Sequence, residues 1–246
     1  MELQNKVALI TGGRRIGATL AADLARQGVD VGLSCHRSAD AMEAAAVQVR
    51  EIGRRALVSK ANIAEPTEVR QLVADTVKAF GRLDILINMA SVYRQCSFDN
   101  LTTDEWNGPM QVDLAGAYEC ARAVVPHMRR VGGGHIICFS DWTAASGRPR
   151  YKGYVPYYVA KRAVMGLTEA LALELATDNI LVNAVAPGPI IPPPELASPE
   201  VQEVERITPL GRWGGAGAIS EVVIGLLKTE FVTGETIRVD GGRHIR

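Results

Sequence analysis

The sequence predicts an α/β fold: a single domain in which helices cover both faces of a doubly wound, parallel, seven-stranded sheet. Two observations predict it. Short apolar runs rich in β-branched residues alternate with longer amphipathic stretches, which is the rhythm of parallel βαβ units. The length of 246 residues also suits one domain over residues 1–246 with a shared sheet better than two small domains with separate cores.

Each expected element follows from its own stretch of sequence. Runs such as KVALIT and DILIN are short, apolar and rich in strand formers, whereas IGATLAADLARQG repeats apolar residues at helical spacing. We expect strands at residues 6–11, 29–34, 55–60, 84–88, 135–139, 180–186 and 236–240, and helices at 16–28, 39–53, 66–80, 104–130 and 156–176.

Two further stretches suggest roles beyond the core. The helices at 104–130 and 156–177 carry wide apolar faces, which favour self-association. The proline-rich run 187–200 follows a strand and opens a possible substrate loop or lid at 187–215. A rigid surface connection, stiffened by its prolines, is an equal alternative.

The composition narrows the function classes. With 27 basic and 27 acidic residues, no attraction to nucleic acid or to an anionic membrane surface is expected. The start MELQNKVALITGG lacks a secretory pattern and no apolar run is long enough to span a membrane, which favours a cytoplasmic protein. Cys35, Cys96, Cys120 and Cys138 show no zinc-ligand spacing, so we expect reduced thiols and no metal site.

A glycine-rich turn, ITGGRRIG, joins the first strand to the first helix. There, glycines let backbone amides approach a pyrophosphate at a helix N-terminus, as in Rossmann-type dinucleotide sites. The second strand ends in Cys35, His36, Arg37 and Ser38, without the carboxylate that bonds the ribose of NAD. Arginine and serine donors suit the 2′-phosphate of NADP(H) instead. The alternative is that Arg37 is only a solvated loop charge.

Tyr157 and Lys161 lie four residues apart on an expected helix, hence on one face. A neighbouring ammonium is expected to lower the pKa of the phenol from about 10, which suits proton donation at neutral pH. An ordinary surface pair has the same spacing, but this pair follows the strand HIICF. The adjacent Tyr158 is expected to point away and pack. Tyr151 and Tyr154 either flank a planar substrate or pack within their own loop.

Asp141 ends a strand at the carboxyl edge of the sheet, where open α/β folds bind ligands. An ionised carboxylate only accepts hydrogen bonds, so it suits a substrate with N–H donors better than a simple ketone. A helix-capping role is the alternative. Trp142 and Trp213 either wall the pocket or are buried packing residues.

The ordered motifs TGGRRIG, INMAS, YYVAK and VAPGPI resemble the short-chain dehydrogenase/reductase family over the whole chain. Arg15, HRSA, Asp141 and VDGGRHIR resemble its pteridine reductase and dihydromonapterin reductase branch more narrowly. The resemblance implies that Tyr157 donates a proton, that Lys161 also bonds the nicotinamide ribose, and that the chain forms a homotetramer. Asp113 replaces the asparagine of a proton relay, and is either a relay carboxylate or only a polar helix residue.

The motifs and the resemblance together give a set of expected contacts. Cofactor contacts are expected from Gly12, Arg14, Arg15, Ile16, Gly17, His36, Arg37, Ser38, Asn62, Ile63, Asn88, Ala90, Lys161, Pro187, Gly188 and Ile190, and catalysis from Tyr157, Lys161, Asp141 and Asp113.

The predicted function is hydride transfer from NADPH to a C=N bond of a dihydropterin, a small-molecule substrate, with protonation organised by Tyr157 and Asp141. One alternative is an NADPH-dependent carbonyl or 3-oxoacyl reductase that uses the same tyrosine and lysine. A second alternative is a sensor that binds NADPH without turnover.

Overall fold

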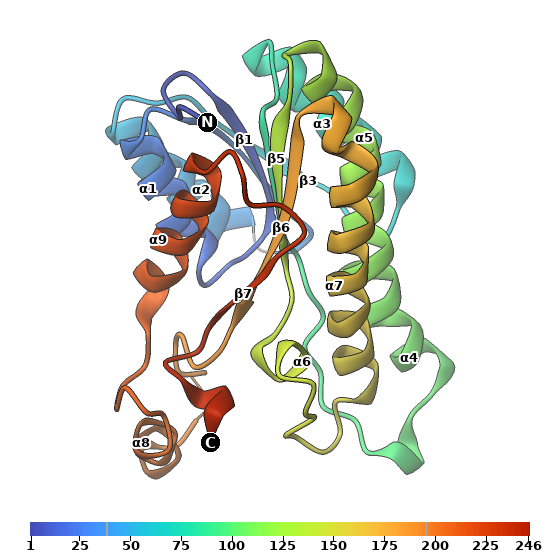
Figure 1. Cartoon of the computed structure of the whole chain (residues 1–246), viewed down its shortest axis with the longest axis vertical. Coiled ribbons are helices and arrows are strands. Elements are labelled where there is room, and N and C mark those ends of the chain that lie inside the picture. Colours follow the sequence, from blue (N-terminus) through green and yellow to red (C-terminus); the bar gives the residue numbers. More distant parts are fainter. Residues whose placement is uncertain (38, 195) are drawn as a thin grey trace.

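The structure is a computed structural model that describes residues 1–37, 39–194 and 196–246 (Figure 1). In these ranges seven strands form one parallel sheet in the order β3-β2-β1-β4-β5-β6-β7, which confirms the predicted doubly wound architecture. The strands are β1 (Val7–Gly12), β2 (Asp30–Cys35), β3 (Ala56–Lys60), β4 (Ile85–Met89), β5 (Gly134–Phe139), β6 (Ile180–Pro187) and β7 (Thr236–Val239).

Two helical layers cover the sheet. One layer holds α1 (Gly17–Arg26), α2 (Ala39–Glu51) and α9 (Gly215–Lys228), and the other holds α3 (Pro66–Phe80), α5 (Gly116–Arg130) and α7 (Val155–Leu175) (Figure 1). Shorter helices lie at the lower end of the view: α4 (Thr103–Pro109), α6 (Trp142–Ala145) and α8 (Ser198–Arg206).

Alternation along the strands produces two separate cores. In β1, Ala8 and Ile10 belong to one buried apolar cluster, while Val7 and Leu9 belong to the other. Because successive side chains of a strand point to opposite faces, a strand covered on both sides must be apolar at every position. This is why short, continuous apolar runs in the sequence predict the strands of the sheet.

The helix expected at 104–130 is corrected by the structure. It begins at Thr103 behind a capping box, in which the Thr102 hydroxyl accepts from the Glu105 amide and the Glu105 carboxylate accepts from the Thr102 amide. The helix then passes through a π-helical turn, Met110–Ala115, before α5 begins. Such turns are frequent at functional sites, and Asp113 lies in this one.

Helices α8 and α9 lie where no helix was expected. Helix α8 buries none of its side chains, and α9 starts with the helix-disfavouring sequence GAGA. Within the described ranges, no helix is both long and apolar enough to cross a bilayer.

Candidate active site

The glycine turn after β1 has the tight geometry that its sequence predicts. Gly12 and Gly13 have φ values of +68° and +81°, in the region that favours glycine. A Cβ on Gly12 would lie 2.7 Å from the Cα of Ala90, at the end of β4. The turn therefore presents bare backbone to the space above the sheet, directly before the start of α1.

A cavity of about 970 Å³ extends from this turn along the carboxyl edge of the sheet. Its size suits a dinucleotide, and the glycine cradle leaves room for phosphates. Eleven of the residues expected to contact a cofactor line it: Gly12, Arg14, Arg15, Ile16, His36, Arg37, Asn62, Ile63, Ala90, Lys161 and Pro187.

Four other expected cofactor residues, Gly17, Asn88, Gly188 and Ile190, do not line this cavity. Asn88 is buried, and its amide donates to the carbonyl of Ala117 at 3.2 Å, which joins β4 to α5. Gly188 packs so closely on Asp240 that a Cβ would lie 2.5 Å from that residue's Cβ. Gly17 packs against the Gly12 carbonyl, Gly188 and Ile190 line a second cavity instead, and Ser38 lies outside the described residues.

Arg15 is not free to meet a phosphate in this structure. Its guanidinium donates to the carbonyls of Ile191 and Pro192, at 2.7 and 2.6 Å. These bonds connect the glycine turn to the proline-rich loop after β6. Arg15 thus holds that loop over the site, while Arg14 and Arg37 remain as cations along the cavity wall.

Lys161 lies in a buried ionic network. Its ammonium donates to the Phe139 carbonyl at 2.8 Å and lies 3.0 Å from Oδ1 of Asp113. Asp113 also accepts from the Ser91 hydroxyl and, at 2.8 Å, from the Val92 amide. The side chains of Lys161 and Asp113 are 4% and 0% exposed. Asp113 is therefore the buried counter-ion of Lys161, and fixes the position of the ammonium.

The expectation that Lys161 lowers the pKa of Tyr157 is wrong for this structure. The pKa of Tyr157 is raised well above its ordinary value by burial, by the nearby carboxylates of Asp141 and Asp113, and by the hydrogen bond to Asp141. The Lys161 ammonium, 5.7 Å from the centre of the tyrosine ring, is already neutralised by Asp113. Tyr157 consequently keeps its proton at neutral pH.

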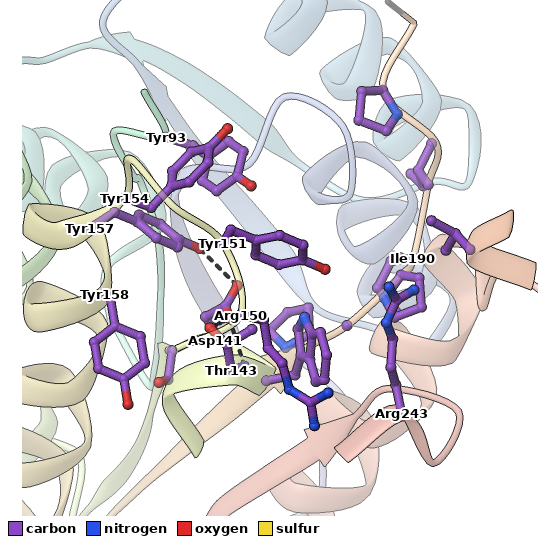
Figure 2. Close-up of a pocket in the computed structure, with 18 of the residues that line it drawn as sticks. Tyr93, Asp141, Thr143, Arg150, Tyr151, Tyr154, Tyr157, Tyr158, Ile190 and Arg243 are labelled. Carbon is purple, nitrogen blue, oxygen red and sulfur yellow. Dashed lines mark hydrogen bonds between the residues drawn. The ribbon is translucent and has the colours of Figure 1, made fainter. Parts of the chain in front are cut away.

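The helix-capping alternative for Asp141 is confirmed, and the same carboxylate also contacts Tyr157. As the N-cap of α6, its Oδ1 accepts from the Thr143 amide at 2.7 Å and from the Thr143 hydroxyl at 2.6 Å. Its Oδ2 accepts from the Tyr157 hydroxyl at 3.1 Å (Figure 2). The capping bonds orient the carboxylate, so that its second oxygen faces the phenol.

A second cavity, of about 420 Å³, adjoins the first and is rich in aromatic rings (Figure 2). Tyr93 stacks on Tyr154 with ring centres 4.6 Å apart, and meets Tyr157 edge-on at 4.8 Å. Tyr151 also lines this cavity. The adjacent Tyr158, which was expected to point away, is also among the residues that line it.

Tyr157 lies where the two cavities meet, since it lines both of them. The sequence motifs missed Tyr93 and Arg243, which also line the second cavity. Tyr93 follows the end of β4 by four residues, so the strand-end rule could have found it. Arg243 is in the C-terminal turn and carries no such signal. Trp142 and Trp213 both line the cavity, and Trp142 is also buried.

A glycine cradle, a dinucleotide-sized cavity and a tyrosine–lysine pair beside a second pocket define a class, the nucleotide-dependent oxidoreductases. A protein-family model described as enoyl-(acyl carrier protein) reductase matches residues 12–244. The chain belongs to the short-chain dehydrogenase/reductase family, whose members are oxidoreductases that use a nicotinamide cofactor.

Named relatives span the whole chain. A 3-oxoacyl-[acyl-carrier-protein] reductase FabG of Staphylococcus epidermidis is 34% identical over 98% of this chain and 100% of its own. The short-chain reductase protein NovJ of Streptomyces niveus is 36% identical over 98% of this chain and 94% of its own. The first of these names agrees with the carbonyl or 3-oxoacyl alternative better than with the pteridine branch, and the second states no substrate.

Solved structures agree with the fold. A short-chain dehydrogenase/reductase from Serratia marcescens superposes with a TM-score of 0.91 at 32% identity, over 99% of this chain and 100% of its own. A short chain dehydrogenase from Burkholderia cenocepacia in complex with NADP has a TM-score of 0.91 at 31% identity, over 99% of both chains.

Proposed function

We propose that this chain is an NADPH-dependent reductase of a small carbonyl compound, with Tyr157 as the proton donor. The observation that carries the proposal is the position of the Tyr157 hydroxyl, at the meeting of a dinucleotide-sized cavity and a smaller aromatic one. The carbonyl substrate is supported by the names of the relatives, of which one is a 3-oxoacyl reductase.

The residues along the first cavity favour NADP(H) over NAD(H). Strand β2 ends without a carboxylate, and the described part of the cavity is lined by Arg14 and Arg37 next to His36. Guanidinium groups bind a 2′-phosphate well, whereas a ribose hydroxyl pair calls for an acid. A structural neighbour in complex with NADP supports the same choice.

In the proposed reaction the bound dinucleotide supplies a hydride to the carbonyl carbon. Tyr157 supplies the proton to the carbonyl oxygen, and its raised pKa keeps that proton in place at neutral pH. Lys161, held by Asp113 and Phe139, lines the dinucleotide cavity beside the phenol, where its ammonium can bond the nicotinamide ribose. Asp141 orients the phenol through its 3.1 Å hydrogen bond.

A second candidate, the reduction of a pteridine C=N bond, is supported by Asp141. A carboxylate beside the proton donor can accept an N–H of an amino-substituted ring, which a simple ketone does not offer. The stacked rings of Tyr93 and Tyr154 also suit a planar substrate. Self-association through α5 and α7 and a closing movement of residues 187–215 stay predictions.

The test is spectrophotometric. NADPH oxidation is followed with a β-keto ester and with dihydrobiopterin as separate substrates, and NADPH affinity is measured in parallel. Turnover of the ester supports the main proposal, and turnover of dihydrobiopterin alone replaces it with the second candidate. NADPH binding without turnover of either, across a wider ketone panel, would contradict both and support the sensor.

A further inference from the structure

The aromatic cavity is electropositive at the end away from Tyr157. Among its described lining residues, three are arginines (Arg15, Arg150 and Arg243) and one, Asp141, is acidic. Asp141 faces Tyr157, and Arg15 bonds to loop carbonyls. Two guanidinium groups are therefore left near the opposite wall, where Figure 2 shows Arg150 and Arg243 reaching in from different segments.

Arg243 is a buried cation, since only 9% of its surface is exposed. Its guanidinium lies 5.3 Å from the centre of the Trp142 ring, and that of Arg150 lies 5.4 Å from the same ring. A cation–π contact uses the face of the group and leaves its five N–H donors available. Among the described residues, no hydrogen bond or ion pair satisfies these donors on Arg243.

Two acids lie near Arg243, and both are already bonded elsewhere. Asp240 accepts from the His244 ring at 2.8 Å and from the Gly242 amide at 3.0 Å. Glu203 forms a two-pronged pair with Arg206, with both distances 2.7 Å. The guanidinium of Arg243 therefore lines the cavity with N–H donors that are open to an acceptor on a ligand.

The backbone holds Arg243 in place. It follows Gly242, whose φ is +82°, and the Arg243 amide donates to the Asp240 carbonyl at 3.1 Å. Asp240 also accepts from the His244 amide at 3.1 Å, which closes the turn. The turn packs on the preceding loop, since the Leu210 amide donates to the Gly241 carbonyl at 3.1 Å. The backbone that carries the Arg243 side chain is thus fixed by hydrogen bonds.

We propose that the substrate carries an oxyanion, a carboxylate or a phosphate, at the end away from the reacting carbon, and that Arg243 binds it. The inference rests on the proposed function in one respect, since it assumes that the aromatic cavity receives the substrate. Arg150, which is exposed and bonded to the Arg246 carbonyl at 2.6 Å, adds positive charge at the rim. An arginine suits this position because its planar guanidinium can donate two parallel hydrogen bonds to a carboxylate or a phosphate.

The test is calorimetric and needs no turnover. Binding of 2-naphthoate, 2-naphthyl phosphate and neutral 2-naphthamide to the NADPH-loaded protein is measured for wild type, Arg243→Met and the control Arg148→Met. Arg148 is an exposed arginine of the loop that carries Arg150, and it is not among the residues that line the cavity. We expect wild type and Arg148→Met to prefer one or both anions to the amide, and Arg243→Met to bind that anion about 10- to 100-fold more weakly.

The two anions identify which oxyanion fits. Equal binding of anions and amide by wild type, or an unchanged preference in Arg243→Met, would overturn the inference. If Arg243→Met does not fold, Arg243→Gln removes the charge while keeping N–H donors, and the same criteria apply. Tyr157→Phe should keep the anion preference while losing turnover, so a failure of the proposed function and a failure of this inference are told apart.

Discussion

Replacing Asp113 by asparagine removes the buried counter-ion of Lys161 without changing the size of the side chain. The two charged atoms are 3.0 Å apart, and at an effective dielectric constant of about 20 they attract each other by roughly 5 to 6 kcal/mol. Breaking such a buried pair from one side costs about 3–5 kcal/mol of stability, because a charge stays behind unpaired. For a chain of this size the midpoint of thermal unfolding should fall by roughly 6–20 °C.

The same substitution should shift the pH dependence of the reaction. Asp113 is one of the charges that raise the pKa of Tyr157, so Asp113→Asn should lower that pKa. Reduction requires the protonated phenol. The wild-type rate should therefore hold through pH 9, and the variant should lose activity at a lower pH than wild type does.

Thermal and urea denaturation, with the pH profile of kcat/KM, are the assays for Asp113→Asn. The matched control is Asp178→Asn, which breaks the surface pair between Asp178 and Arg129 and should change neither quantity noticeably. If Asp113→Asn unfolds at the wild-type temperature and keeps the wild-type pH profile, the reasoning about the buried network is refuted.

Three further substitutions test other parts of the account. Gly12→Ala forces a Cβ to 2.7 Å from the Ala90 Cα at a φ of +68°, and should weaken NADPH binding by tenfold or more in a fluorescence titration. Unchanged binding would contradict the role of the glycine turn in holding the phosphates. Arg37→Asp should reduce the preference for NADPH over NADH by at least tenfold, and an unaltered ratio of the two kcat/KM values would show that other groups bind the 2′-phosphate. Burial and the N-terminal ammonium lower the pKa of His135 to about 4, from an ordinary value near 6.5. As the pH falls, the unfolded chain takes up a proton on His135 before the folded chain does, which lowers the free energy of unfolding. Between pH 7 and pH 4, urea titrations should show wild type losing roughly 3 kcal/mol more of its free energy of unfolding than His135→Asn does. Equal losses in the two proteins would contradict this prediction.

The sequence predicted the sheet and one end of the site because both depend on local patterns. Strands that are buried on both faces are continuous apolar runs, so the sequences KVALIT and DILIN were enough to predict β1 and β4. Tyr157 and Lys161 are related by helical spacing, and Asp141 by the end of a strand. In each case a short stretch of chain determines where the side chain points.

What the sequence could not give depends on contacts between distant segments. The direction of the Tyr157 pKa shift follows from Asp113, 44 residues earlier in the chain, which neutralises Lys161 before it can act on the phenol. Arg243 reaches Trp142 across about a hundred residues, and no local pattern marks it. The π-helical turn that contains Asp113 also has no signature in the residue types alone.

The central claim is that the Tyr157 phenol transfers a proton beside the bound dinucleotide, and Tyr157→Phe tests it most directly. The rate of NADPH oxidation is measured with whichever substrate the wild type turns over, together with the dissociation constant for NADPH, and Tyr158→Phe serves as the neighbouring control. The account predicts a loss of about 10²- to 10⁴-fold in kcat with NADPH affinity unchanged, and near wild-type activity for Tyr158→Phe. A Tyr157→Phe protein that keeps most of its activity would contradict it.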